Sequence, residues 1–115
     1  YSMPPAHGAA VVYTIMSNPE LKAEWELEVA AMRDRINGLR EKLVSKLAAS
    51  GVSKDFSFIK DQRGMFSYSG LTLEQVRTLR SEYAIYIADT GRMSVAGVSD
   101  SNIDYLCESI AKVVG

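Results

Sequence analysis

The most constraining feature of the sequence is a run of apolar residues spaced three or four apart, which predicts one long amphipathic helix. Asn18 and Pro19 provide the N-cap and first-position signals, and Ser50 with Gly51 predicts the end. The apolar positions are Leu21, Trp25, Val29, Met32, Ile36, Leu39, Leu43 and Leu47. Charged residues fill the other faces, where we expect solvent: Glu24, Glu28, Arg33, Arg40 and Lys46.

This helix is longer than the domain to which it belongs. About 31 residues at about 1.5 Å each span roughly 46 Å, whereas a 100-residue domain has a radius of gyration of about 13 Å. We therefore expect the helix to pair with another chain, or its first half to pack on a domain outside this sequence. Gly38 lies inside the helix, where glycine costs about 1 kcal/mol relative to alanine. It indicates a bend, close packing or a tolerated surface position.

Composition argues against several classes of protein. The 115 residues carry a formal net charge of -1, so no broad basic surface is available and no nucleic-acid partner is expected. No apolar run approaches the roughly 18 residues of a membrane span, so no membrane partner is expected. The single cysteine fits a reducing compartment, and we expect a cytoplasmic protein. Because Met3 is not the first residue, we expect the chain to be part of a longer protein.

Short elements flank the long helix. A helix from about His7 to Met16 is predicted before it. After it, four strands are predicted, at "DFSFI" (55–59), "GMFSYSG" (64–70), "AIYIA" (84–88) and "RMSVAG" (92–97). Thr72 and Gln75 form the capping box of a helix over 73–83, and a last helix capped by Ser99 or Ser101 follows. The pattern predicts a two-layer α/β unit with a short sheet.

Arg92 is the leading candidate for binding chemistry. If Met93 and Val95 face the helices, the alternation of a strand places Arg92 on the opposite face. Phe66 and Tyr68 share one face of the strand predicted in 64–70, and an aromatic ring beside Arg92 would fix the plane of its guanidinium. The planar fork of arginine suits bidentate binding of a carboxylate. The alternative, a surface arginine near Asp89, stays open at this point.

Other kinds of site are not indicated. No cluster of His, Cys, Asp and Glu has metal-ligand spacing, so no metal site is predicted. The chain has no nucleophile elbow, P-loop or dinucleotide fingerprint. Cys107 lies on the apolar stripe of the last helix and is expected in the core, and His7 is expected to start a helix. All six lysines fall on polar faces or loops, where a Schiff-base lysine is not expected.

Three motifs together carry a family resemblance: "YSMPPAHGA", "GMFSYSGL" and "GRMSVAG". The chain resembles, in order and over its whole length, the C-terminal part of the aspartate aminotransferases, class I aminotransferases that depend on pyridoxal phosphate. The resemblance implies an α/β small C-terminal domain over 31–115, preceded by a long interdomain helix. Residues 1–30 would then be the tail of the large cofactor domain and the first half of that helix.

The resemblance also implies roles for particular residues. Arg92 would bind the substrate α-carboxylate, and Phe66 would line the site beside it. Tyr1 and Ser2 would reach the active site of the neighbouring subunit in a homodimer. The family's Schiff-base lysine and the residues that hold the cofactor ring lie upstream, so no catalytic, cofactor-binding or metal residue is implied within this chain. We therefore expect pyridoxal 5'-phosphate in the longer parent and no activity from the chain alone.

The implied reaction moves an amino group between L-aspartate, or a similar amino acid, and 2-oxoglutarate. Met3 and Ser94 occupy positions where asparagine is common in the family, which leaves an aromatic amino acid aminotransferase open as an alternative. A non-catalytic alternative is a helical dimerisation module, in which the long helix pairs with another chain and Arg92 is incidental.

Overall fold

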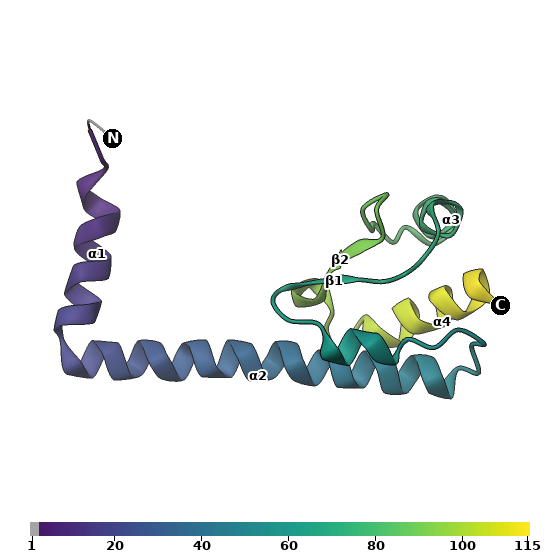
Figure 1. The fold of residues 1–115 in the computed structure, drawn as a ribbon, viewed down its shortest axis with the longest axis horizontal. Helices are drawn as coiled ribbons and strands as arrows, with labels where there is room; N and C mark the ends of the chain where they lie inside the picture. The colour runs from purple at the N-terminus through teal and green to yellow at the C-terminus, as the bar shows by residue number, and fades with distance from the viewer. Residues whose placement is uncertain (1–2) are drawn as a thin grey trace. The chain divides into compact units, whose positions relative to one another are not determined.

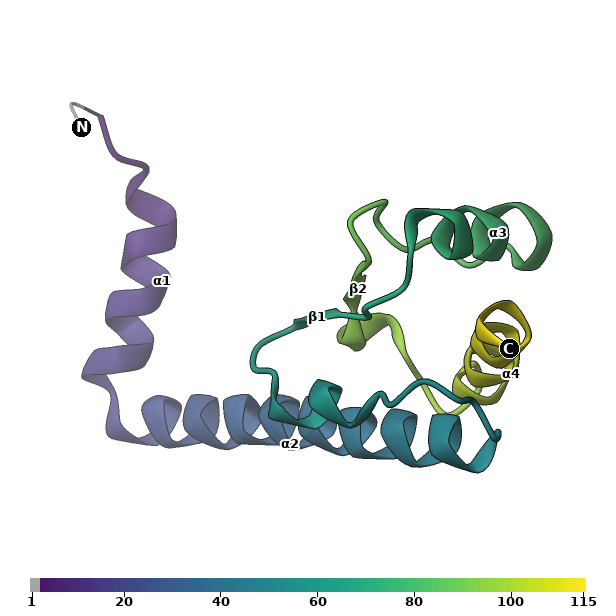
Figure 2. The same ribbon diagram turned by 45° about the vertical axis from the view of Figure 1, so that its right-hand side comes forward.

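The computed structural model describes residues 3–115, and the predicted helical elements are present (Figures 1 and 2). By contacts the chain divides into two compact units, of which one ends at Asp34 and the other extends from Arg35 to Gly115. The regular elements are α1 (Ala6–Ser17), α2 (Pro19–Ala49), η1 (Ser57–Asp61), β1 (Phe66–Tyr68), α3 (Leu73–Tyr83), β2 (Arg92–Ser94), η2 (Val95–Gly97) and α4 (Ile103–Val114). Tyr1 and Ser2 lie outside the described residues, so their predicted role at a neighbouring subunit stays a prediction.

Capping side chains start α2 and α3 where the sequence predicts. The Oδ1 atom of Asn18 accepts hydrogen bonds from the backbone N–H groups of Glu20 at 3.0 Å and Leu21 at 3.2 Å, which confirms the predicted N-cap of α2. At α3, Thr72 Oγ1 accepts from the Gln75 backbone at 3.2 Å, and Gln75 Oε1 accepts from the Thr72 backbone at 2.9 Å. The predicted capping box is therefore present.

The start of α4 differs from the prediction. Neither serine hydroxyl caps the helix; Ser99 and Ser101 bond to each other through their Oγ atoms at 2.8 Å. The backbone carbonyl of Ser99 instead accepts from the N–H of Ile103 at 3.0 Å. The amide of Asn102 holds this turn, since its Oδ1 accepts from the Ser99 N–H at 2.8 Å. Cys107 is buried on α4 as predicted, and burial raises the pKa of its thiol to about 11.

Two of the four predicted strands form the sheet of the described chain. β1 and β2 pair antiparallel, with Phe66 opposite Ser94, Ser67 opposite Met93 and Tyr68 opposite Arg92. The strands predicted in 64–70 and 92–97 are thus confirmed, although β2 passes into the 3₁₀ turn η2 after three residues.

The strands predicted at 55–59 and 84–88 are wrong. Asp55 accepts hydrogen bonds from the backbone and hydroxyl of Ser57, at 2.8 and 2.9 Å, and this local turn leads into the 3₁₀ helix η1. Ala84 has a φ of 52° and ends α3, and the N–H of Ile85 bonds back to the Leu79 carbonyl at 3.0 Å. Apolar runs alone do not distinguish these segments from strands.

The core of the Arg35–Gly115 unit joins the second half of α2 to the elements that follow it. Leu43 and Leu47 of α2, Val76 and Leu79 of α3, and Val95 after β2 are each at most 1% exposed. In the first half of α2 the same apolar stripe is exposed, at Leu21, Trp25, Val29 and Met32. One periodic stripe therefore lies in two different environments, and the change coincides with the boundary between the units.

The structure favours the surface interpretation of Gly38, since this residue is exposed and a Cβ built on it meets nothing within 4 Å. We predict that Gly38→Ala raises the free energy of unfolding by about 0.5–1 kcal/mol, because alanine loses less backbone entropy in a helix. Urea unfolding of the chain measures this change. Gly91→Ala is the matched control and should destabilise, because Gly91 has a φ of 84° and its Cβ would lie 3.3 Å from Ser69 Oγ. A lower midpoint for Gly38→Ala would contradict the prediction.

Candidate functional site

The strands β1 and β2 form a two-stranded ribbon, and the structure brings Arg92 and Phe66 together on its exposed face. Met93 and Val95 are buried while Arg92 and Ser94 are exposed, so the predicted alternation is confirmed. The guanidinium carbon of Arg92 lies 4.9 Å from the centroid of the Phe66 ring. A cation at this distance over an aromatic face is attracted by the ring quadrupole. The ring therefore restrains the plane of the guanidinium.

The alternative pairing of Arg92 with Asp89 is not observed. Asp89 is bound from α3 instead: Arg80 Nη2 lies 2.7 Å from its Oδ1, and Arg77 Nη2 lies 3.7 Å from its Oδ2. Within residues 3–115 the guanidinium of Arg92 makes no ion pair and no hydrogen bond. An exposed arginine with a restrained plane and no acidic partner is suited to bind a carboxylate from solution.

The contacts of Asp89 also fix the loop that leads into β2. Arg80 Nη2 donates to the Ile87 carbonyl at 3.0 Å as well as to Asp89, so one side chain of α3 holds this loop at two points. The hydrogen bond from Arg80, followed by the charges of Arg80 and Arg77, lowers the pKa of the Asp89 carboxyl below its usual value.

A second arginine, Arg40 of α2, lies under the ribbon, so the prediction that it lies on a solvated face is wrong. It is 1% exposed. Its Nη2 donates to the carbonyls of Gly64 at 2.6 Å and Phe66 at 2.9 Å, and its Nη1 donates to the Ile59 carbonyl at 3.2 Å and to the Ser67 hydroxyl. Burial, followed by the charge of Arg63, lowers the pKa of the guanidinium. Its position four residues after Ile36 and three before Leu43 puts it on the apolar stripe, a signal that was available in the sequence.

Polar groups hold the end of the ribbon at which Tyr68 pairs with Arg92. The buried Ser69 hydroxyl donates to the Gly91 carbonyl at 2.7 Å, directly before Arg92. Gln62 binds both backbone groups of Tyr68: its Oε1 accepts from the N–H at 2.9 Å and its Nε2 donates to the carbonyl at 3.2 Å. The Gln62 amide thus takes the place of a further strand at this point of the β1 edge.

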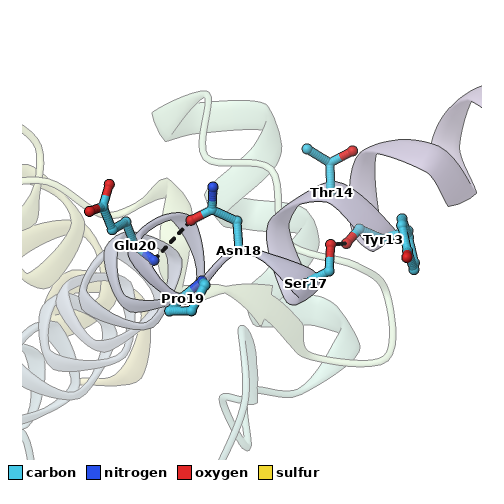
Figure 3. A pocket seen from close by; sticks show the side chains of 6 residues that line it. All are labelled: Tyr13, Thr14, Ser17, Asn18, Pro19 and Glu20. Atoms are coloured by element: carbon cyan, nitrogen blue, oxygen red, sulfur yellow. Dashed lines mark hydrogen bonds between the residues drawn. The ribbon is translucent and has the colours of Figure 1, made fainter.

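The pocket in Figure 3 lies in the unit that ends at Asp34 and is not a candidate for carboxylate binding. It encloses about 720 Å³, is open to solvent, and has one charged residue in its lining, the acidic Glu20. Arg92 and Phe66 are not part of it. It is lined by Tyr13, Thr14, Ser17, Asn18, Pro19 and Glu20.

Three of the six lysines make contacts that do not suit covalent attachment of an aldehyde cofactor, which needs a deprotonated amine. Lys42 and Lys46 are paired with Asp100 and Asp104, and the hydrogen bond from Lys46 to Asp104 raises the pKa of that amine. Lys54 donates to the Gly70 carbonyl. Residues 3–115 contain no group of three metal-binding side chains. Over the same range, no helix combines the length and apolar character needed to cross a membrane.

Comparison with known proteins agrees with the fold. The family model described as aminotransferase class I and II matches residues 1–110. Aspartate aminotransferase of Escherichia coli K12 is 52% identical over 114 residues, which are 99% of this chain and 29% of that protein. This chain belongs to the class I and II aminotransferase family, and it spans about 29% of the length of the curated relatives it matches.

Solved structures of the family superpose on the whole chain. A mitochondrial aspartate aminotransferase from Trypanosoma brucei matches with a TM-score of 0.96 and 44% identity, covering 100% of this chain and 30% of that one. An aromatic-amino-acid aminotransferase from Burkholderia pseudomallei, covalently bound to pyridoxal phosphate, matches with a TM-score of 0.96 and 50% identity, covering 100% and 29%. The predicted fold, an α/β part of this transferase fold with a long helix before it, is confirmed.

The Asp89–Arg80 contact predicts a dependence of stability on pH. The pKa of Asp89 is lowered in the folded chain, so its contribution is present above the usual value of 3.8 and is lost as the pH falls through the folded pKa. We predict that lowering the pH from about 7 to about 3 reduces the free energy of unfolding less in the Asp89→Asn variant than in the unmodified chain. Urea midpoints at both pH values measure the difference. Asp61→Asn is the control, since Asp61 makes no ion pair within 3–115; equal acid sensitivity of all three chains would contradict the prediction.

Proposed function

We propose that this chain is the small-domain portion of a pyridoxal-phosphate-dependent aminotransferase, and that its Arg92 binds the α-carboxylate of the amino acid substrate. The observation that carries the proposal is the unpaired guanidinium of Arg92 held 4.9 Å from the Phe66 ring centroid on an exposed face. Family membership supports the reaction class, and the names of the relatives support an amino acid as the substrate.

The two side chains have complementary tasks in this proposal. Arg92 supplies a permanent positive charge and two parallel N–H donors, which match the two oxygens of a carboxylate. Phe66 is 46% exposed, so its ring supports the guanidinium and still presents surface to a ligand. A carboxylate held at two points orients the remaining bonds at the α-carbon, including the C–H bond that must break.

The remainder of the reaction belongs to the longer protein. Pyridoxal phosphate, when bound there, supplies the electron sink for carbanion chemistry. The small domain would close on the substrate, carry Arg92 inward and exclude water. We further propose a homodimer in which Tyr1 and Ser2 reach the neighbouring site, and a domain boundary near residue 30. A reducing compartment such as the cytoplasm suits its single, buried cysteine.

Aspartate and aromatic amino acids share the group that Arg92 would bind. Both kinds of aminotransferase occur among the similar proteins, with an aromatic-amino-acid aminotransferase of Pseudomonas aeruginosa 48% identical over 113 residues. Because every amino acid carries the α-carboxylate, the role of Arg92 does not depend on the side chain of the substrate. We propose L-aspartate with 2-oxoglutarate as the substrate pair, because three similar proteins that are 50–52% identical to this chain are named aspartate aminotransferases.

A second candidate function is the helical dimerisation module. It is favoured by the exposed apolar residues Leu21, Trp25 and Val29 on the first half of α2. It predicts that the chain alone forms a stable, functional oligomer. Aminotransferase parentage predicts instead that the chain alone shows neither activity nor the visible absorbance of a cofactor Schiff base, and that the longer protein shows both. Sedimentation together with absorbance after addition of pyridoxal phosphate separates the two.

We predict that Arg92→Lys in the full-length protein lowers kcat/KM about 100-fold or more for every amino acid substrate, since lysine keeps the charge but loses the fork. Steady-state kinetics with L-aspartate and with L-phenylalanine measure this loss. Arg77→Lys is the matched control, because Arg77 is an exposed arginine whose one described partner is Asp89, and it should leave both values unchanged. Unchanged kinetics for Arg92→Lys would refute the assignment.

A further inference from the structure

We infer that Arg40 is a positioning residue for the carboxylate site: it fixes the backbone of Phe66 from the opposite face of the ribbon and so sets the place of the ring that supports Arg92. This inference rests on the proposed function of Arg92. It assigns to the long helix α2 a specific contact with the candidate site, made through one side chain.

Core packing does not explain an arginine at this position. Taking a charge out of water is costly, and an apolar residue of similar volume would avoid that cost. Arg40 has no carboxylate partner within residues 3–115, and its Nε is buried without an acceptor. Its stabilising contacts are the hydrogen bonds from Nη1 and Nη2. The reason for an arginine here must therefore be found in the groups that accept those bonds.

Three of the four groups that accept hydrogen bonds from Arg40 belong to Phe66 or to residues close to it in the sequence. They are the carbonyl of Gly64, the carbonyl of Phe66 itself and the hydroxyl of Ser67. The bonds reach the backbone from the buried face, while the Phe66 ring lies on the exposed face with Arg92. Both views of the ribbon show β1 passing over the part of α2 that precedes its C-terminal end (Figures 1 and 2). The position and direction of the ring thus follow from the position of the α2 guanidinium.

The same helix also holds the end of the partner strand. Arg35 Nη2 donates to the Val98 carbonyl at 3.1 Å and approaches the Ala96 carbonyl at 3.5 Å, in and after the turn η2 that follows β2. Phe66 pairs with Ser94 across the ribbon, so the two attachments constrain both strands. In the closure of the small domain proposed above, these attachments to α2 would carry Phe66 and Arg92 together.

The test uses the full-length enzyme with Arg40→Met, which keeps an unbranched side chain but is shorter and removes the donors, and Arg40→Lys, which keeps the charge but cannot reach all four acceptors. Misplacing a binding group by about 1 Å can cost about 100-fold in rate. We expect Arg40→Met to raise KM about tenfold or more for both L-aspartate and L-phenylalanine, with partial recovery in Arg40→Lys. Amounts of active sites are normalised by the cofactor absorbance.

Leu47→Ala is the control for a merely structural role. It removes buried apolar contacts from the same helix and lowers the thermal midpoint, but it makes no hydrogen bond to the ribbon, so its KM values should not change. If Arg40→Met lowers the midpoint and leaves KM unchanged, like Leu47→Ala, the inference is overturned. If Arg40→Met does not fold, Ser67→Ala decides, because it removes one acceptor only: an increase in KM of about threefold supports the inference, and an unchanged KM overturns it.

Arg92→Lys is measured in parallel. If Arg92→Lys leaves kcat/KM unchanged, the proposed function of Arg92 fails. If Arg92→Lys lowers kcat/KM while Arg40→Met leaves KM unchanged, the inference about Arg40 alone fails.

Discussion

The structure of the ribbon depends on one buried positive charge whose hydrogen bonds go to backbone carbonyls and a hydroxyl. Arg40 extends from α2 into the core and binds the chain at Gly64, Phe66 and Ser67. A sheet of two three-residue strands has little stability of its own. The helix therefore has to hold it, and the exposed face of the ribbon can then present Phe66 and Arg92 in a fixed relation.

Much of the fold could be predicted from the sequence, because the spacing of apolar residues and the capping side chains indicate where helices lie. Asn18 and the pair Thr72 and Gln75 make the hydrogen bonds that their positions predict. The failures at 55–59 and 84–88 have local causes that an apolar run does not reveal: a turn held by Asp55, and the left-handed Ala84 that ends α3. In both segments, hydrogen bonds within the chain's own turns replace a sheet.

The candidate site could be predicted in part. Strand alternation placed Arg92 on the exposed face, and the aromatic ring expected beside it is the ring of Phe66. Whether Asp89 would pair with Arg92 depended on Arg77 and Arg80 of α3, which bind Asp89 instead. Arg40 was missed because a charged residue on a helix is ordinarily solvated. Its hydrogen bonds to residues 59–67 are tertiary contacts that periodicity does not encode.

The central claim is that Arg92 binds the α-carboxylate, and a crystal structure of the full-length protein with bound α-methyl-L-aspartate tests it most directly. The account predicts two N–H to oxygen contacts of about 2.7–2.9 Å between the Arg92 fork and the α-carboxylate, with the Phe66 ring against the same guanidinium. An α-carboxylate bound by other groups, with Arg92 directed into solvent, would contradict it.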